Sequence, residues 1–367
     1  MSALLEVFYD ADVDAASGLA FDEAMANECA ARAVPGAMLR LYNYKDNCVL
    51  VGRFQRIEAE VDLAKAAALG VDVNRRPTGG GAILMGSGQL GVAFCVPAQR
   101  FVSPRAGFYL FSQAIVAALA SLGVEASLRG KNDIEVSGRK IAGLGFCLSE
   151  GGLLFHASIL VDIDLQLMAS LLQIPLSKLS AYGPGGISER ITTLNRESGT
   201  SVAPGSLQEA IVGAFESTFD LFAEDSQASE ALKVRAKALE HDKYTTQGWL
   251  FDGGRATSGE FLADCRSRLG TLRLVVASQG GVIKSAVVTG DFNSESTAFI
   301  ALEEALRWVP IEESLLERSI SDNGELVNLL DPAELAKAIC ASHAASGSTS
   351  AGPRRIGSCY IPEEKIS

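Results

Sequence analysis

Two arginines stand directly before three glycines in the segment RRPTGGG, residues 75–81. Because glycines carry no side chain, a ligand can lie against the backbone, whose N–H groups can then face anionic oxygens. The guanidinium groups of Arg75 and Arg76 add fixed positive charge and forked donors that suit a carboxylate or a phosphate. A tight turn explains three glycines equally well. The segment lacks the Gly-Lys-Ser/Thr ending of a P-loop, so it does not indicate a site of that type.

A second group of polar residues lies in KNDIEVSGRKIAG, residues 131–143. The carboxylate of Asp133 is suited to a Mg²⁺ ion that neutralises phosphate charge. Lys140 follows a predicted two-residue turn at Ser137-Gly138, from which its ammonium group can reach an acyl carboxylate or an acyl phosphate. Charged residues beside turns are common, so a solvated hairpin is the simpler interpretation of this segment taken alone.

His156 lies inside the apolar segment LLFHASILV, residues 153–161. A single histidine in such a strand is more often a hydrogen-bonded core residue than a catalyst. The other two histidines stand in polar surroundings, and the seven cysteines are scattered and never form a C-x-x-C motif. The sequence therefore predicts no zinc site and no disulfide framework, as expected of a reduced, cytoplasmic protein.

The pattern of apolar residues predicts helices and strands in an irregular order. We expect helices over residues 17–33 (with Ser17 as the N-cap), 61–69, 104–122, 164–173 and 205–223. We expect strands over residues 37–44, 49–54, 71–76, 82–86, 90–96 and 153–162, the first two as neighbours, and a hairpin over 134–146. Because strands and helices do not alternate steadily, the fold class is predicted to be α+β, with a mixed or antiparallel sheet flanked by helices.

The texture of the sequence changes after about residue 225, where a charged helical segment precedes a predicted hairpin at 271–292 and a predicted helix at 294–306. We therefore expect a large domain over residues 1–230 and a small α+β accessory domain over residues 240–340. The end of the chain, residues 341–367, contains a Ser/Gly-rich stretch and is predicted to be a flexible tail.

The composition excludes several classes of protein. Of the 367 residues 48% are hydrophobic, which supports a packed core, and the net charge is −12. A protein that coats nucleic acid or an anionic membrane normally needs a basic face, so we expect neither partner. No run of about 18 apolar residues indicates a membrane helix, and no secretory signal is apparent at the N-terminus.

Six segments carry these residues and their surroundings: SGLAFDEAM (17–25), VGRFQ (51–55), RRPTGGGAIL (75–84), KNDIEVSGRKIAG (131–143), FHASILVDIDL (155–165) and GISERITTL (186–194). Together, and in this order, they resemble the motifs of the lipoate–protein ligase family, which shares a superfamily with octanoyltransferases and biotin protein ligases. The region from GWLF (248–251) to FIALEEALRW (299–308) resembles the small accessory domain of the ligases.

The resemblance implies a catalytic domain like that of class II aminoacyl-tRNA synthetases and biotin ligases. It also implies a two-step reaction, in which lipoate or octanoate and ATP, with Mg²⁺, form an acyl-adenylate. The acyl group then passes to a lysine of a lipoyl-domain protein, such as the E2 subunit of a 2-oxoacid dehydrogenase or a protein like the H protein of glycine cleavage. Such a reaction needs no protein nucleophile, since the protein positions the reactants and neutralises charge.

The same resemblance assigns roles to individual residues. Lys140 is expected to be the catalytic residue, because it would polarise the carboxyl group and stabilise the adenylate. Nucleotide or phosphate binding is expected at Lys131, Asn132 and Asp133, with Asp133 also holding Mg²⁺. The residues expected to bind the acyl-adenylate are Arg53, Arg75, Gly79, Gly80, Gly81, Gly143 and His156.

Two departures from the family pattern leave alternatives open. Met85 stands where the family usually has a histidine, and FHAS replaces H-H-G-T. One alternative is therefore a non-catalytic lipoate-binding protein. Another is an ATP-independent octanoyl or lipoyl transferase that works through a thioester on Cys147. The apolar neighbours of Cys147 should raise the pKa of its thiol and favour a packing role.

Overall fold

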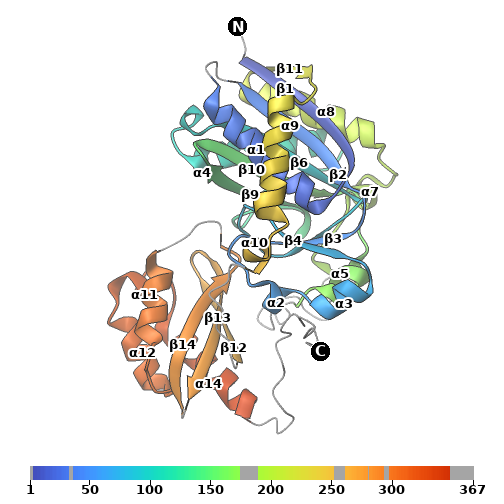
Figure 1. Ribbon diagram of the computed structural model, residues 1–367. Helices are drawn as coiled ribbons and strands as arrows, with labels where there is room; N and C mark the ends of the chain where they lie inside the picture. Colours follow the sequence, from blue (N-terminus) through green and yellow to red (C-terminus); the bar gives the residue numbers. More distant parts are fainter. Residues whose placement is uncertain are drawn as a thin grey trace, which may run out of the picture.

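An eight-stranded mixed sheet forms the centre of the larger part of the chain, in the order β11-β1-β2-β6-β10-β9-β8-β7 (Figure 1). The computed structural model describes residues 3–32, 36–173, 189–251, 261–279, 281–292 and 297–347. The strands are β1 (Ala3–Val13), β2 (Ala37–Tyr44), β6 (Gln89–Pro97), β7 (Ser127–Arg129), β8 (Asp133–Val136), β9 (Arg139–Ser149), β10 (Gly152–Leu160) and β11 (Leu221–Asp225). Strand β1 runs parallel to β2 and β11, whereas the other neighbours are antiparallel. The predicted α+β fold with a mixed sheet is confirmed.

Helices cover both faces of this sheet. Helices α4 (Pro104–Ser121) and α8 (Pro204–Phe219) pack on one face, and α1 (Ala15–Ala31) and α9 (Glu230–Leu239) on the other. Because successive side chains of a strand point to opposite faces, Phe94 and Phe155 join the core under α4 and α8, while Cys95 and Leu154 join the core under α1. Strands β6 and β10 are buried along their whole length.

A second, three-stranded sheet lies beside the large one, in the order β4-β3-β5. Its strands are β3 (Cys48–Val51), β4 (Asp72–Arg75) and β5 (Ile83–Met85), and short helices accompany it: α2 (Ile57–Glu60), α3 (Leu63–Ala68) and α5 (Leu165–Leu171). The predicted pairing of residues 37–44 with 49–54 is wrong, because β2 pairs with β1 and β6 while β3 pairs with β4 and β5. This small sheet carries the chain into and out of the glycine-rich segment.

The C-terminal part has its own sheet, β12-β13-β14, and its own core. Its elements are β12 (Phe261–Ser267), β13 (Gly270–Gln279), β14 (Val282–Gly290), α11 (Thr297–Leu306), α12 (Glu313–Ser321), α13 (Gly324–Val327) and α14 (Pro332–Gly347). Among its contacts with the large part, Arg273 donates to the carbonyl oxygen of Ala59 at 2.6 Å and pairs with the carboxylate of Glu60 at 2.8 Å. This C-terminal part, which we call the accessory domain below after the prediction, therefore packs against the segment that follows β3 (Figure 1).

Several predicted element limits differ from the structure. Helix α1 begins at Ala15, and the hydroxyl of Ser17 donates to the carbonyl of Asp14 instead of capping the helix. Residues 221–223, predicted as helix, lie in β11, because Asp220 adopts a left-handed conformation that ends α8. Strand β1, which the sequence analysis did not predict, lies between β2 and β11.

Residues near the predicted domain limits pack as parts of helices and cores. Leu232 and Ala236 of α9, and Tyr244, share a core with α1. Residues 232–244 therefore pack with the large part of the chain, although the domain limits themselves stay a prediction. At the C-terminus, α14 continues through residues 341–347, the start of the predicted flexible tail, and residues 348–367 lie outside the described residues.

The contact of α1 with the start of β10 leads to a stability prediction. A Cβ atom added at Gly152 would lie 2.0 Å from the backbone oxygen of Ala26 in α1. Gly152→Ala should therefore force α1 away from the sheet and lower the free energy of unfolding by roughly 1–3 kcal/mol. Equilibrium unfolding in urea measures the change.

Gly205→Ala is the matched control, because a Cβ atom there has no neighbour within 4 Å and the residue lies in the first turn of α8. It should leave the free energy of unfolding unchanged or raise it by less than about 1 kcal/mol. Equal unfolding midpoints for the two variants would contradict the proposed packing of α1 on β10.

Candidate active site

A cavity of about 390 Å³ lies between the face of the large sheet, the small sheet and the accessory domain. It falls within the range of small-molecule sites. At one end its lining residues are buried, and they include Leu19, Tyr42, Tyr44 and Leu50. We call this the inner end. At the other end Lys140 and Asp133 are half-buried and Arg190 and Gln173 are exposed, and we call this the mouth. The buried lining is mixed, because Gln55, Glu60, Arg76, Thr78 and His156 are buried there together with the apolar and aromatic residues.

Glycines on β9 create the space for this cavity. Gly143 and Gly145 lie opposite Ser158 and His156 of β10 and share their face of the sheet. A Cβ atom at Gly143 would lie 2.9 Å from the Nζ atom of Lys140. The absence of a side chain at Gly143 therefore leaves the room in which the Lys140 side chain lies.

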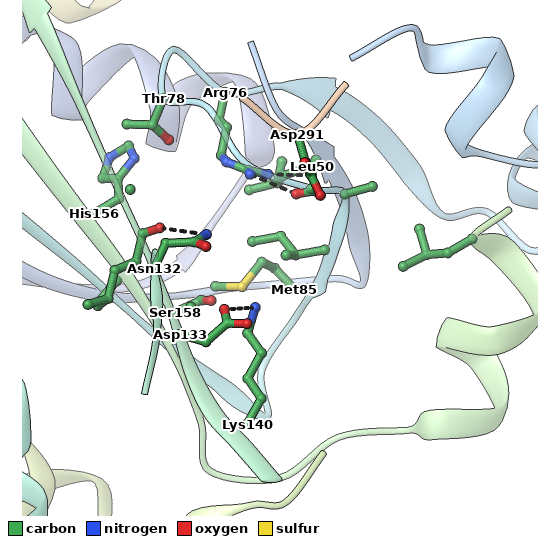
Figure 2. Close-up of a pocket in the computed structure, with 18 of the residues that line it drawn as sticks. Leu50, Arg76, Thr78, Met85, Asn132, Asp133, Lys140, His156, Ser158 and Asp291 are labelled. Atoms are coloured by element: carbon green, nitrogen blue, oxygen red, sulfur yellow. Dashed lines mark hydrogen bonds and ion pairs between the residues drawn. The ribbon is translucent and has the colours of Figure 1, made fainter. Parts of the chain in front are cut away.

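Lys140 and Asp133 form an ion pair at the mouth, with 2.7 Å between Nζ and Oδ1 (Figure 2). They come from the two strands of the β8–β9 hairpin, whose turn residues Ser137 and Gly138 both have positive φ, as a type I′ turn requires. The backbone of Lys140 is also fixed from its other side, since its N–H donates to the carbonyl of Arg190 at 2.8 Å. The hairpin thus brings together the ammonium and the carboxylate expected from the sequence.

Arg76, Thr78 and Gly81 of the glycine-rich loop line the same cavity across from Lys140 (Figure 2), whereas Gly79 and Gly80, also expected to bind the acyl-adenylate, are not among its lining residues. The loop passes so close to Gly52 that a Cβ atom there would lie 1.9 Å from the carbonyl oxygen of Gly80. The buried guanidinium of Arg76 holds the loop by donating to the carbonyl oxygens of Leu50, Gly79 and Gly81 at 2.7–2.8 Å. Burial lowers the pKa of Arg76 to about 10, so this side chain keeps its charge at neutral pH.

Arg75 and Arg53, both expected to bind the acyl-adenylate, are placed differently. The guanidinium of Arg75 is fully buried and donates to backbone carbonyls of two segments, residues 52–55 and 249–250. Arg53 lies over the ring of Trp249, with 4.6 Å from Cζ to the ring centroid. Neither residue lines the cavity among the described residues. Arg76 is the arginine of the pair whose side chain reaches the wall.

The turn before β8 contributes Asn132 to the cavity, whereas Lys131 points to the accessory domain. The amide nitrogen of the Asn132 side chain donates to the carbonyl of Leu144 at 3.3 Å. The ammonium group of Lys131 donates to the backbone carbonyl of Arg268. Burial lowers the pKa of Lys131, and the charge of Asp291 opposes this shift. Asp291, also from the accessory domain, lines the cavity beside Arg76 (Figure 2).

His156 lines the cavity and belongs to a buried network centred on Asp22. Its Nε2 atom lies 2.9 Å from Oδ2 of Asp22, which also accepts from the hydroxyl of Tyr42, while Oδ1 accepts from Arg40. Burial alone would raise the pKa of Asp22, but Arg40 and His156 more than offset it, so the pKa is lowered. The ionised carboxylate therefore fixes the imidazole through its Nε2–H.

Sequence reasoning assigned no role to Asp22, although it lies in SGLAFDEAM, one of the segments that resemble the ligases. Asp22 lies between apolar residues on one side and Glu23 on the other, and the available signal was only that a carboxylate buried in such a helix needs a partner. Thr78 and Asp291 line the cavity and were not singled out either. Asp291 could not be found from sequence, since it comes from a different domain.

Cys147 and Met85 bear on the alternatives that the sequence left open. Cys147 lies on the same face of β9 as Gly145 but farther along, where it packs against the core under α1, and it does not line the cavity among the described residues. Burial raises the pKa of its thiol to about 12. Met85 does line the cavity, next to Leu50 and Ile83, so the residue in place of the family's histidine adds apolar surface.

A resident metal centre is not apparent in the described part of the chain, which holds no group of three or more His, Cys, Asp or Glu side chains suited to one. Among the described residues no helix combines the length and the apolar composition that a membrane span requires.

Comparison with known proteins identifies the larger part of the chain. The family model "Lipoyl protein ligase A/B catalytic domain" matches residues 14–216, more than half of the sequence. Among curated proteins, the octanoyltransferase LipM of Symbiobacterium thermophilum is 28% identical over 256 residues, which cover 63% of this chain and 92% of that protein.

Two solved structures share the fold. The bipartite lipoate protein ligase of Thermoplasma acidophilum, studied with its E2 lipoyl domain, has a TM-score of 0.62 at 26% identity and covers 70% of this chain and 99% of its own. A lipoate–protein ligase A bound with ATP has a TM-score of 0.60 at 25% identity and covers 69% of this chain and 100% of its own. Because the family model spans six of the eight strands of the large sheet, with the glycine-rich loop and the β8–β9 hairpin, the chain belongs to the lipoyl protein ligase A/B family.

Proposed function

We propose that this chain is an ATP-dependent lipoate–protein ligase, which adenylates lipoate or octanoate and transfers the acyl group to a lysine of a lipoyl domain. The observation that carries the proposal is the position of Lys140. Its ammonium group lies at the charged mouth of a cavity that is also lined by Leu19, Leu50 and Met85, opposite a glycine-rich loop held by Arg76. One cavity thus offers groups for the carboxylate, the alkyl chain and the phosphates of an acyl-adenylate.

The position of Lys140 at the mouth sets the proposed orientation of the acyl substrate. A carboxylate is stabilised next to the ammonium group of Lys140 at the mouth. The alkyl chain then extends inward, where Leu19, Leu50 and Met85 remove it from water. His156 and its partner Asp22 belong to the wall that the chain passes. A fatty acid of medium length suits this arrangement.

The chemistry follows from that orientation. An oxygen of the substrate carboxylate attacks the α-phosphorus of ATP, the bond to the β-phosphate oxygen breaks, and pyrophosphate leaves. The ε-amine of the acceptor lysine then attacks the carbonyl carbon, AMP leaves, and the amine loses a proton to solvent. Lys140 stabilises the negative charge that develops on the acyl and phosphate oxygens in both steps. The protein itself forms no covalent bond in this scheme.

Asp133 fits a Mg²⁺ ion that arrives with ATP. Mg²⁺ is usually held by one or two carboxylates together with substrate phosphates and water, and Asp133 presents a half-buried carboxylate at the mouth. When bound, the ion would neutralise phosphate charge. Asp133 is the residue that would hold it, and Lys140 beside it supplies the fixed positive charge for the carboxylate.

The acceptor is proposed to be a lipoyl-domain protein, either the E2 subunit of a 2-oxoacid dehydrogenase or a protein like the H protein of glycine cleavage. A structurally similar ligase was studied together with an E2 lipoyl domain. The half-buried position of Lys140 at the mouth allows a lysine from a second protein to approach the mixed anhydride from solvent.

Removing the ammonium group tests the role of Lys140. Lys140→Met keeps the length of the side chain but loses the charge, so acyl-adenylate formation should slow by at least about 100-fold, as for other preorganised charge donors. Pyrophosphate release measures the rate. Lys233→Met, an exposed lysine on α9 paired with Glu230, is the control and should change nothing.

The activity itself is tested by mixing the purified protein with lipoate or octanoate, ATP-Mg and an apo lipoyl domain. We expect the acceptor mass to increase by one acyl group, with one pyrophosphate released for each modification. Acyl transfer from an acyl-carrier protein without ATP would favour the octanoyltransferase alternative instead. Tight lipoate binding without pyrophosphate would favour the non-catalytic alternative.

The thiol of Cys147 provides a separate test. Because burial raises its pKa to about 12, the group stays protonated through the neutral range and becomes a thiolate only as the pH rises toward that value. At pH 8 iodoacetamide should therefore leave Cys147 unmodified in the folded protein, as peptide mass spectrometry can show. Rapid labelling of Cys147 at that pH, or an acyl thioester on it, would support the cysteine mechanism.

A further inference from the structure

Carbonyl oxygen atoms of the accessory domain accept hydrogen bonds from groups that are expected to bind the phosphates of the adenylate. The N–H of Gly80, the central residue of the glycine-rich loop, donates to the carbonyl oxygen of Phe292 at 2.9 Å. The ammonium group of Lys131 donates to the carbonyl oxygen of Arg268. Both donors therefore already hold oxygen acceptors, although the sequence indicates that they serve an anionic ligand.

Asp291 adds a negative charge at the same place. It lines the cavity beside Arg76 (Figure 2), and its Cβ atom lies 3.9 Å from where a Cβ atom of Gly81 would stand. Its carboxylate is held in position because Oδ1 accepts from the backbone N–H of Thr271 at 2.5 Å. The backbone of a glycine-rich loop favours a nearby phosphate. The carboxylate of Asp291 lies beside this loop and therefore takes the place that a phosphate would have.

Further contacts hold this edge of the accessory domain in place. The carbonyl oxygen of Phe54 accepts from the N–H of Gly290 at 3.2 Å and from the hydroxyl of Thr289 at 3.0 Å. Arg273 pairs with Glu60 in a buried position. Asp291 and Phe292 therefore reach the glycine-rich loop as part of an ordered interface.

We propose that Asp291 and Phe292 form an internal competitor for the phosphates of the nucleotide. Phosphate oxygens need the N–H of Gly80, and their charge is opposed by the carboxylate of Asp291, so nucleotide binding and this interdomain contact exclude each other. The inference rests on the proposed function, because it assumes that the glycine-rich loop receives ATP. By linkage, the contact weakens ATP binding by the same factor by which bound ATP weakens the contact, so a variant with a weaker contact should bind ATP more tightly.

Asp291→Asn tests the proposal with little change in shape. Asparagine keeps the oxygen that accepts from Thr271 but loses the charge, so the dissociation constant of ATP-Mg should fall by about fivefold, at the lower end of typical coupling factors. Isothermal titration calorimetry measures it, with inorganic pyrophosphate as a second probe that carries phosphates alone. Asp322→Asn, an exposed aspartate at the end of α12, is the matched control.

Amide hydrogen exchange gives an independent readout. In the protein without ligand the N–H of Gly80 should be protected by Phe292, and ATP should increase exchange at residues 289–292 as the contact is lost. Equal or weaker ATP binding by Asp291→Asn, or no change in exchange at residues 289–292, would overturn the inference. If wild type and variants alike fail to bind ATP, the proposed function fails with it, whereas equal binding by all of them rejects only the competition.

Discussion

The site depends on how closely the glycine-rich loop approaches the segment after β3. Only because residue 52 has no Cβ atom can the carbonyl of Gly80 lie against it. The two arginines before the loop stabilise this arrangement by donating to different sets of carbonyl groups. Arg75 satisfies carbonyls on the outside, from residues 52–55 and 249–250, and Arg76 satisfies carbonyls within the loop and on β3. Buried carbonyls without such donors would each cost about 1–3 kcal/mol.

Charge at the mouth is balanced before any ligand arrives. The chain carries a net charge of −12, yet cationic groups gather around this cavity, and each has an acceptor nearby. Lys140 pairs with Asp133, Arg76 with loop carbonyls, and Lys131 with a carbonyl of the accessory domain. We therefore expect an anionic substrate to displace the acceptors that these cationic groups already contact. Such an exchange of partners would allow an acidic protein to hold the nucleotide of the proposed reaction.

The inner end of the cavity obeys a different constraint. Asp22 is completely buried, and such a charge is tolerated only with close partners. Arg40 and His156 supply them from β2 and β10, and Tyr42 adds a hydroxyl. The network thus joins α1 to two strands of the sheet and, at the same time, orients the imidazole and a tyrosine that line the wall. The packing of α1 and the orientation of two residues of the cavity wall therefore depend on the same carboxylate.

Local signals in the sequence were sufficient for many elements of the fold. Pro104 and Gly123 bracket α4, with Gly123 at positive φ, and Ser137-Gly138 forms the predicted turn of the β8–β9 hairpin. These elements follow from short-range preferences of backbone and turn residues. Strand β1 and its partner β11 were missed, because pairing across the whole chain decides whether such segments form strands.

The family and the types of residue at the site were determined by the sequence itself, since Lys140, Asp133 and the glycine-rich loop occur in recognisable segments. Which arginine reaches the cavity was decided only by the tertiary structure. Neighbours on a strand point to opposite sides, so Arg75 turns to α10 (Gln247–Phe251) and Arg76 to the loop. The place of Asp291 likewise depends on how two domains pack, which no local pattern encodes.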